Sequence, residues 1–125
     1  MVPAKSILTV SRDPLLQRSR TLLLEHEGYE VTPLEGDLAV HAFLDAAYHP
    51  PLSLVLMCHS VPEKSRVRLC KAIKERYPRT PILMLYNGYD PTTAEVDGRL
   101  ENVHDPRALV DMLALLLRPE EAQAE

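Results

Sequence analysis

The sequence has no long hydrophobic run, few cysteines and no excess of positive charge, and each shortage excludes a class of protein. No apolar stretch approaches the ~20 residues of a membrane-spanning helix, and the apolar run near the N-terminus is too short for a signal peptide. The two cysteines, Cys58 and Cys70, are expected to be reduced thiols in the cytoplasm. A net charge of −4 gives the chain as a whole no attraction for nucleic acid.

The motifs of common enzyme sites are also missing. The sequence contains no G-x-S-x-G nucleophile turn, no P-loop and no G-x-G-x-x-G phosphate-binding turn. Its histidines lack the spacing to one another and to cysteine that zinc sites use. We therefore expect no cofactor, no metal ion and no enzymatic turnover.

What the sequence does contain is an alternation of short apolar segments with longer amphipathic ones. The apolar segments predict five strands, the last of them weak, over residues 6–10, 29–32, 54–57, 82–86 and 99–103. A chain of 125 residues can bury roughly 70% of its unfolded surface, so it needs no metal or disulfide to fold. We predict a single domain over residues 1–118, followed by a polar tail over 119–125.

Local residue chemistry predicts where the helices begin and which faces they bury. Asp13-Pro14 and Asp105-Pro106 each precede a helical pattern, since Asp can cap free backbone N–H groups and Pro fits the first helical position. Asp37 is expected to cap the second helix, and the third is expected over residues 63–77. In the first helix, the leucines that recur at helical spacing predict the buried face: Leu15, Leu16, Leu22 and Leu23.

The order of the elements predicts the fold class. Continuous apolar strands alternating with helices indicate a parallel sheet covered on both faces. Because crossovers between parallel strands are right-handed, the predicted fold is a doubly wound α/β sheet. Ligand chemistry in such sheets sits at the C-terminal ends of the strands. The polar residues expected around one crevice there are Ser11, Arg12, Asp13, Cys58, Tyr86 and Asn102.

Two segments carry a resemblance to a known family. In LVLMCHSVP, an apolar run leads into Cys58, and Pro62 follows four residues later; CKAIKERYPRTPILMLY adds a helix and another apolar strand. Both segments resemble the receiver domains of two-component response regulators, and the resemblance covers about residues 5–117. It implies a five-stranded, flavodoxin-like (βα)5 fold of the chemotaxis-regulator type, and a role in phosphorelay signal transduction.

The resemblance implies that the acidic phosphorylation site is degenerate. Cys58 stands at the position of the phosphoacceptor aspartate, and Ser11 and Arg12 stand where the family has two magnesium-binding acids. Asp13 is better explained as a helix cap. Mg²⁺ prefers oxygen ligands, and a thiol, a hydroxyl and a guanidinium offer it no anionic oxygen. We therefore expect no phosphorylation at position 58.

Two further family positions are changed. Tyr86 corresponds to a small hydroxyl residue at the end of the fourth strand, and Asn102 corresponds to a lysine near the end of the fifth. A bulky tyrosine cannot make the movement by which such hydroxyl residues follow the phosphoryl group. Since only about 16 residues separate these two positions, the family's fourth helix is expected to be shortened.

These changes predict a stand-alone pseudo-receiver that acts through protein–protein contact. The expected partner is another signalling protein, such as a histidine kinase or an output protein, and residues 99–117 are the expected contact surface. A homodimer is left open, and neither a membrane nor nucleic acid is expected as a partner.

Three alternatives remain open at this stage. Cys58 could be a redox-sensing thiol with its thiolate favoured by Arg12, or a small apolar residue that fills a vacated pocket. His59 could accept a phosphoryl group in place of an aspartate. A run of basic residues between 64 and 79 could form a surface for an acidic partner, or be the solvated face of an amphipathic helix.

Overall fold

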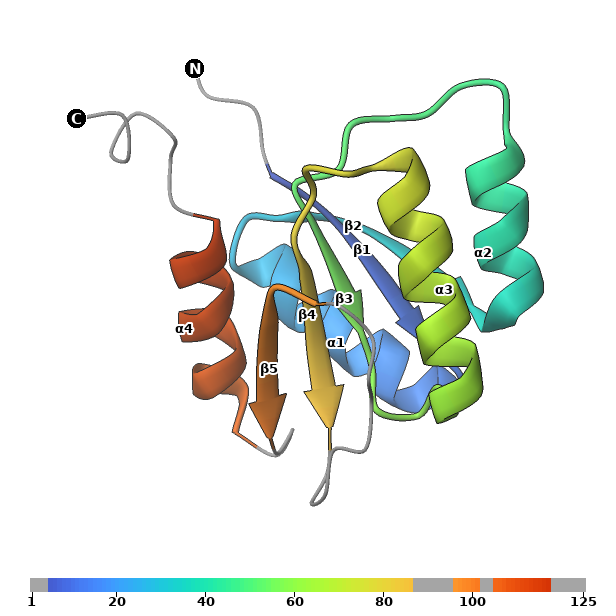
Figure 1. The fold of residues 1–125 in the computed structure, drawn as a ribbon. Helices are drawn as coiled ribbons and strands as arrows, with labels where there is room; N and C mark the ends of the chain where they lie inside the picture. The colour runs from blue at the N-terminus through green and yellow to red at the C-terminus, as the bar shows by residue number, and fades with distance from the viewer. Residues whose placement is uncertain (1–4, 87–95, 102–104, 118–125) are drawn as a thin grey trace.

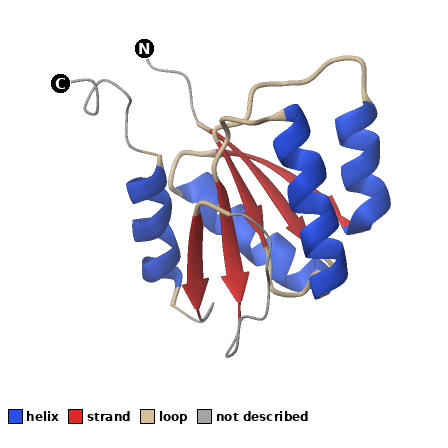
Figure 2. Ribbon diagram, in the orientation of Figure 1, coloured by secondary structure: helices blue, strands red, loops and turns tan. Residues whose placement is uncertain are grey.

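The structure is a computed structural model that describes residues 5–86, 96–101 and 105–117, arranged as one sheet with helices on both faces (Figure 1). The strands are β1 (Ser6–Ser11), β2 (Glu30–Glu35), β3 (Leu54–Met57), β4 (Ile82–Tyr86) and β5 (Gly98–Glu101). The helices are α1 (Pro14–His26), α2 (Gly36–Asp45), α3 (Glu63–Arg76) and α4 (Pro106–Leu116). Strand and helix alternate from β1 to β4, and α4 follows β5, as Figure 2 shows by colour.

All strand pairs are parallel, and the strand order is β2-β1-β3-β4-β5. The chain therefore runs outward from β1 to one edge of the sheet, returns to β3 and continues to the other edge. This is the doubly wound α/β fold that the sequence predicts, and the predicted bounds of β3 and β4 are correct to the residue. Both strands are almost entirely apolar, and β3 is buried along its whole length.

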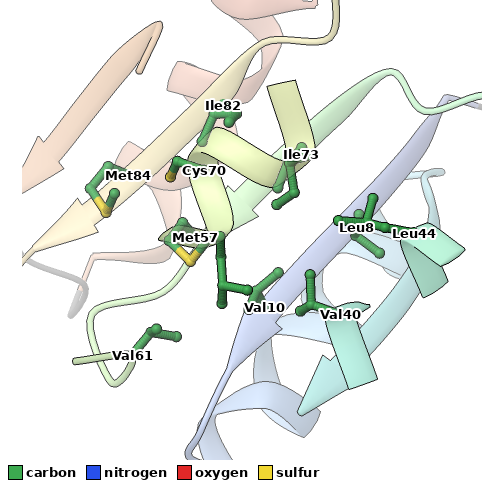
Figure 3. Packing of buried hydrophobic residues seen from close by; sticks show 12 residues of the cluster. Leu8, Val10, Val40, Leu44, Met57, Val61, Cys70, Ile73, Ile82 and Met84 are labelled. Carbon is green, nitrogen blue, oxygen red and sulfur yellow. The ribbon is translucent and has the colours of Figure 1, made fainter. Parts of the chain in front are cut away.

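Two apolar clusters lie on opposite faces of the sheet. The first packs under α2 and α3, and Figure 3 shows Cys70 there among Ile73, Ile82 and Met84. The second packs under α1 and α4 and includes Leu24, Leu109 and Leu113 with the strand residues of that face. Successive residues of β3 alternate between the two clusters, as expected when side chains of a strand point to opposite faces.

The predicted caps at Asp13 and Asp105 are confirmed. The carboxylate of Asp13 accepts hydrogen bonds from the backbone N–H groups of Leu15 (3.1 Å) and Leu16 (3.2 Å). Asp105 accepts one from Arg107 N–H at 3.0 Å. In both helices Pro occupies the first turn, where its missing N–H costs nothing.

The prediction that Asp37 caps the second helix is wrong. Helix α2 begins one residue earlier, at Gly36, whose φ of 84° lets the chain turn sharply out of β2. Glu35 is the residue before the helix, and its side chain makes no capping hydrogen bond. Asp37 therefore lies inside the first turn, where its carboxylate is available for other partners.

The predicted buried face of the first helix is right for Leu16 and Leu23, which are partly buried, and wrong for Leu15 and Leu22. Leu15 and Leu22 are 74% and 59% exposed, whereas the buried residues of α1 are Gln17, Arg20 and Leu24. Gln17 donates hydrogen bonds to the backbone carbonyls of Thr9 and Leu34, which ties the helix to both β1 and β2. The rotation of α1 about its axis is thus set by contacts with the sheet, and apolar spacing alone misjudges it.

Some predictions fall on residues outside the described ranges. These are the shortened fourth helix between β4 and β5, the polar tail over 119–125, and Asn102. The described end of β5 is Glu101, so the predicted continuation of this strand to residue 103 also lies outside. None of the helices in the described ranges is long and apolar enough to cross a membrane.

Candidate functional site at the ends of the strands

The ends of β1 and β3 meet at the C-terminal edge of the sheet. Val10 and Met57 are paired in register, and the N–H of Cys58 donates to the carbonyl of Val10 at 2.9 Å. Ser11, the next residue of β1, is buried. Two of the positions predicted from the sequence, Ser11 and Cys58, are therefore brought together by the strand pairing.

A pair of serine hydroxyls occupies this edge. The Oγ atoms of Ser11 and Ser60 lie 3.0 Å apart, and Ser60 Oγ accepts a hydrogen bond from the N–H of Arg12 at 2.9 Å. Ser11 Oγ also accepts from the N–H of Asp13 at 3.0 Å. The two hydroxyls thus connect the end of β1 with the loop that follows β3. Sequence reasoning missed Ser60, because its role depends on the approach of two loops 49 residues apart.

Beside the serine pair lies a cluster of charged groups that we call the Asp37 cluster: Arg12, Asp37, Ser65 and Arg68. Asp37 accepts from the Nη2 atoms of Arg12 (2.7 Å) and Arg68 (3.0 Å), one on each carboxylate oxygen. Both guanidinium groups also approach Ser65 Oγ, at 3.4 and 3.3 Å. The cluster joins the loop after β1 to the first turns of α2 and α3.

The Asp37 carboxylate is held in its charged form. The hydrogen bond from Arg12 is the largest cause of a pKa below the ordinary aspartate value, and Ser65 and Arg68 act in the same direction against partial desolvation. Arg12 is 44% exposed and Asp37 20% exposed, so water screens the pair only in part. Sequence reasoning assigned Asp37 to a cap and gave no sign of this pairing.

Cys58 lies on the other side of its strand from the Asp37 cluster. Its side chain is fully buried in the apolar cluster beneath α1 and α4, and burial raises the pKa of the thiol. The cation beside it is Arg20 of α1, which partly offsets that effect. The expectation that Arg12 favours a Cys58 thiolate is therefore wrong, because Arg12 reaches outward to Asp37.

Comparison with known proteins identifies the fold. No protein-family model matches the chain, and no curated protein matches it significantly. Among solved structures, it is similar to a response regulator receiver domain of Methanospirillum hungatei, with 26% identity and a TM-score of 0.78, covering 97% of this chain and 99% of that chain. A chemotaxis protein of Vibrio cholerae gives 22% identity and a TM-score of 0.73, covering 92% and 100%. The fold is that of response regulator receiver domains.

A further similar structure, named as an adenylate cyclase of Rhodopirellula baltica, shares 20% identity and a TM-score of 0.79, covering 93% of this chain and 89% of that chain. At this identity the likeness concerns the fold. The receiver neighbours connect the fold with two-component signalling, and the chain spans nearly their whole length.

The remaining predicted site residues occupy varied places on the receiver fold. Asp13 is the cap of α1, as expected. Tyr86 is the half-buried last residue of β4 and pairs in register with Glu101 of β5. Asn102 lies outside the described residues, so the structure does not test its place. Ser11, Arg12 and Cys58 are the predicted residues that gather where β1 and β3 end.

The basic residues of α3 have varied surroundings, which argues against one free cationic face. Arg66 is only 7% exposed, and its Nη1 atom lies 3.7 Å from the sulfur of Met84. Lys74 pairs with Asp97 at 2.9 Å and donates to a backbone carbonyl. Arg68 belongs to the Asp37 cluster. The exposed basic residues that remain are part of an ordinary amphipathic helix surface.

The donor groups at this edge suit hydrogen bonding more than metal binding. Within the described ranges, no three His, Cys, Asp or Glu side chains come together in a way that could hold a metal ion. The groups at the ends of β1 and β3 are hydroxyls, a guanidinium and a buried thiol. Cys70, on the other face of the sheet, is buried as predicted, and its pKa is raised to about 11.

Proposed function

We propose that this chain is a pseudo-receiver that transmits a signal by protein–protein contact, without phosphorylation of an aspartate. The receiver fold supports the signalling role, and the chemistry at the ends of β1 and β3 supports the absence of phosphorylation. The acid positions of the family correspond to Ser11, Arg12 and Cys58 in this chain. The role is that of a binding module with no catalytic turnover, working in the cytoplasm.

The observation that carries the proposal is the ion pair between Arg12 and Asp37. Aspartyl phosphorylation in receivers depends on a divalent cation that neutralises the charge of the transferring phosphoryl group. Here a guanidinium is tied down at 2.7 Å beside the same strand end. Arg12 supplies a fixed positive charge there and repels a divalent cation, and it cannot coordinate the phosphoryl donor as a metal ion does.

The buried thiol supports the same conclusion from the acceptor side. Cys58 is fully buried against α1, and the desolvation that raises its pKa keeps it a neutral thiol near pH 7. A neutral buried thiol is a poor nucleophile toward a phosphoryl donor in solution. It fills space between the sheet and α1, as a small apolar residue would.

The partner proposed is another protein of a two-component system, such as a histidine kinase or an output protein. We place the contact surface on β5 and α4, where Leu115 is a large apolar side chain 54% exposed to solvent. A homodimer through this surface is an alternative arrangement. Either partner would read the shape of the domain, since the proposed mechanism has no phosphorylated state to detect.

The test is the intact mass of the protein after incubation with acetyl phosphate and Mg²⁺. We expect the mass to remain that of the unmodified chain, whereas an acid-bearing receiver in the same mixture gains about 80 Da. A stoichiometric gain by this chain would contradict the proposal. Fragmentation of any adduct would then show whether His59 or another residue carries the group.

A further inference from the structure

A pocket of about 240 Å³ lies on the face of the sheet covered by α1 and α4, against β4 and β5. Its walls are mostly apolar and are formed by Leu16, Leu23, Leu85, Leu100, Pro106 and Leu109. Three residues with polar groups complete it: Ser19, Arg20 and Asp105. Ser19 and Asp105 are exposed and mark the rim, whereas Arg20 lies in the interior.

Arg20 is the unusual member of this lining. The residue is only 6% exposed, and its Nη1 atom is buried without a hydrogen-bond partner among the described residues. The guanidinium lies beside the Cys58 sulfur, a weak acceptor that carries no charge as a thiol. Buried charges in proteins are normally paired, because an unpaired charge loses its hydration with no compensation.

We infer that this pocket binds a small organic acid, with one carboxylate on Arg20 and an apolar body between α1 and α4. A planar guanidinium matches a carboxylate in shape and charge, and a bond between them is stronger than one between neutral groups. The apolar walls offer the rest of the ligand a favourable environment. Arg20 is the cationic residue of the lining, and it forms no ion pair among the described residues, so a bound carboxylate would pair its charge.

The size and charge of the pocket narrow the ligand class. An apolar cavity of about 150 Å³ holds benzene, so a volume of 240 Å³ accepts one aromatic ring or a short alkyl chain with its carboxylate. Asp105 at the rim adds a negative charge, which disfavours ligands with two or more anionic groups. Inorganic phosphate and phosphorylated peptides therefore fit the pocket poorly.

The pocket lies away from the Asp37 cluster and borders β5 and α4, which form the proposed contact surface for a partner. It is bordered by α4 and β5, and α4 packs against β5 in the described structure. A ligand that fills the space between α1 and α4 would stabilise the position of α4. The inference does not depend on whether the chain is phosphorylated, so it can fail or succeed independently of the proposed function.

The test uses phenylacetate as the probe and ¹⁵N-labelled protein. We expect amide shifts in α1 and α4 around the pocket, with a dissociation constant of about 1 mM or tighter for a ligand of this size. The neutral isostere phenylacetamide is expected to bind at least about tenfold more weakly, because it cannot form the charged bond. Inorganic phosphate is expected to produce no such shifts.

The matched variants are Arg20→Met and Arg18→Met. Both remove one positive charge from α1, but Arg18 is exposed and does not line this pocket. We expect Arg20→Met to weaken phenylacetate binding at least about tenfold and Arg18→Met to leave it nearly unchanged. Ser19→Trp, at the exposed rim, is expected to obstruct entry without altering the core, and it serves if Arg20→Met does not fold.

The inference is overturned if phenylacetate causes no shifts around the pocket. It is equally overturned if the acid and the amide bind alike, or if Arg20→Met folds and binds as the unmodified protein does. Phosphate shifts as strong as those of phenylacetate would show that the apolar walls do not select the ligand, and would also overturn it.

Discussion

Arg12, in the loop after β1, and Asp37, in the first turn of α2, form an ion pair in which Nη2 of Arg12 lies 2.7 Å from Oδ1 of Asp37. They are 25 residues apart in the chain. The second carboxylate oxygen is taken by Arg68 of α3 at 3.0 Å. One aspartate thus connects the end of β1 with two helices at the C-terminal edge of the sheet.

We predict that this pair stabilises the fold modestly. In a double-mutant cycle of Arg12→Met and Asp37→Asn, the coupling in the free energy of unfolding is expected to be about 0.5–1 kcal/mol, since the pair is only partly screened. Denaturant unfolding measures it. The control cycle uses Arg76 and Asp45, which lie 3.8 Å apart on the surface, and is expected to show little coupling. Equal couplings for the two pairs would contradict the importance of the Asp37 cluster.

The lowered pKa of Asp37 predicts a dependence of stability on pH. The pKa of the Asp37 carboxyl is lower in the folded protein than in the unfolded chain. Such a carboxyl stabilises the fold at pH values above the pKa of an aspartate in the unfolded chain, about 3.9. This contribution is lost as the pH falls from that value through the folded pKa. Unfolding curves of the natural protein and of Asp37→Asn should therefore converge on acidification. A difference that does not change between neutral and acidic pH would disprove the assignment.

We predict that neither cysteine reacts with a thiol reagent while the protein is folded. Cys58 is fully buried and Cys70 nearly so, and burial raises the pKa of both thiols. Near neutral pH, an alkylating reagent should modify both thiols only after the protein is denatured. Rapid labelling of Cys58 in the native protein would instead support the thiol-sensor alternative. Cys58→Ser would identify which cysteine had reacted.

The orientation of α1 predicts opposite outcomes for two neighbouring leucines. Leu24→Ala removes a fully buried side chain and is expected to cost about 2–5 kcal/mol of unfolding free energy. Leu22→Ala, at a position 59% exposed on the same helix, is expected to change it by no more than about 0.5 kcal/mol. Thermal or denaturant unfolding distinguishes them. If Leu22→Ala lowered the unfolding free energy more than Leu24→Ala does, Leu22 would lie on the buried face of α1, as leucine spacing suggests.

Sequence reasoning succeeded where the determining interactions are local. The apolar runs gave β3 and β4 their bounds, and Asp-Pro pairs marked the starts of α1 and α4. The doubly wound parallel sheet followed from general rules for connections between parallel strands. It failed for Leu15 and Leu22 of α1, because a leucine-rich helix offers several apolar faces, and the contacts of Gln17 with two strands select among them.

The amino-acid sequence by itself determined which residues stand at the ends of the strands, and hence that Ser11, Arg12 and Cys58 meet at one edge of the sheet. Only the tertiary structure decided the partner of each. Arg12 donates a hydrogen bond to Asp37, and the hydroxyl of Ser11 pairs with that of Ser60. Cys58 lies on the face of the sheet where Arg20 is its neighbour. The physical reason is that a polar side chain pairs with whatever group the folded chain brings within its reach. Sequence spacing does not tell which groups far apart in the chain come within hydrogen-bonding distance of each other.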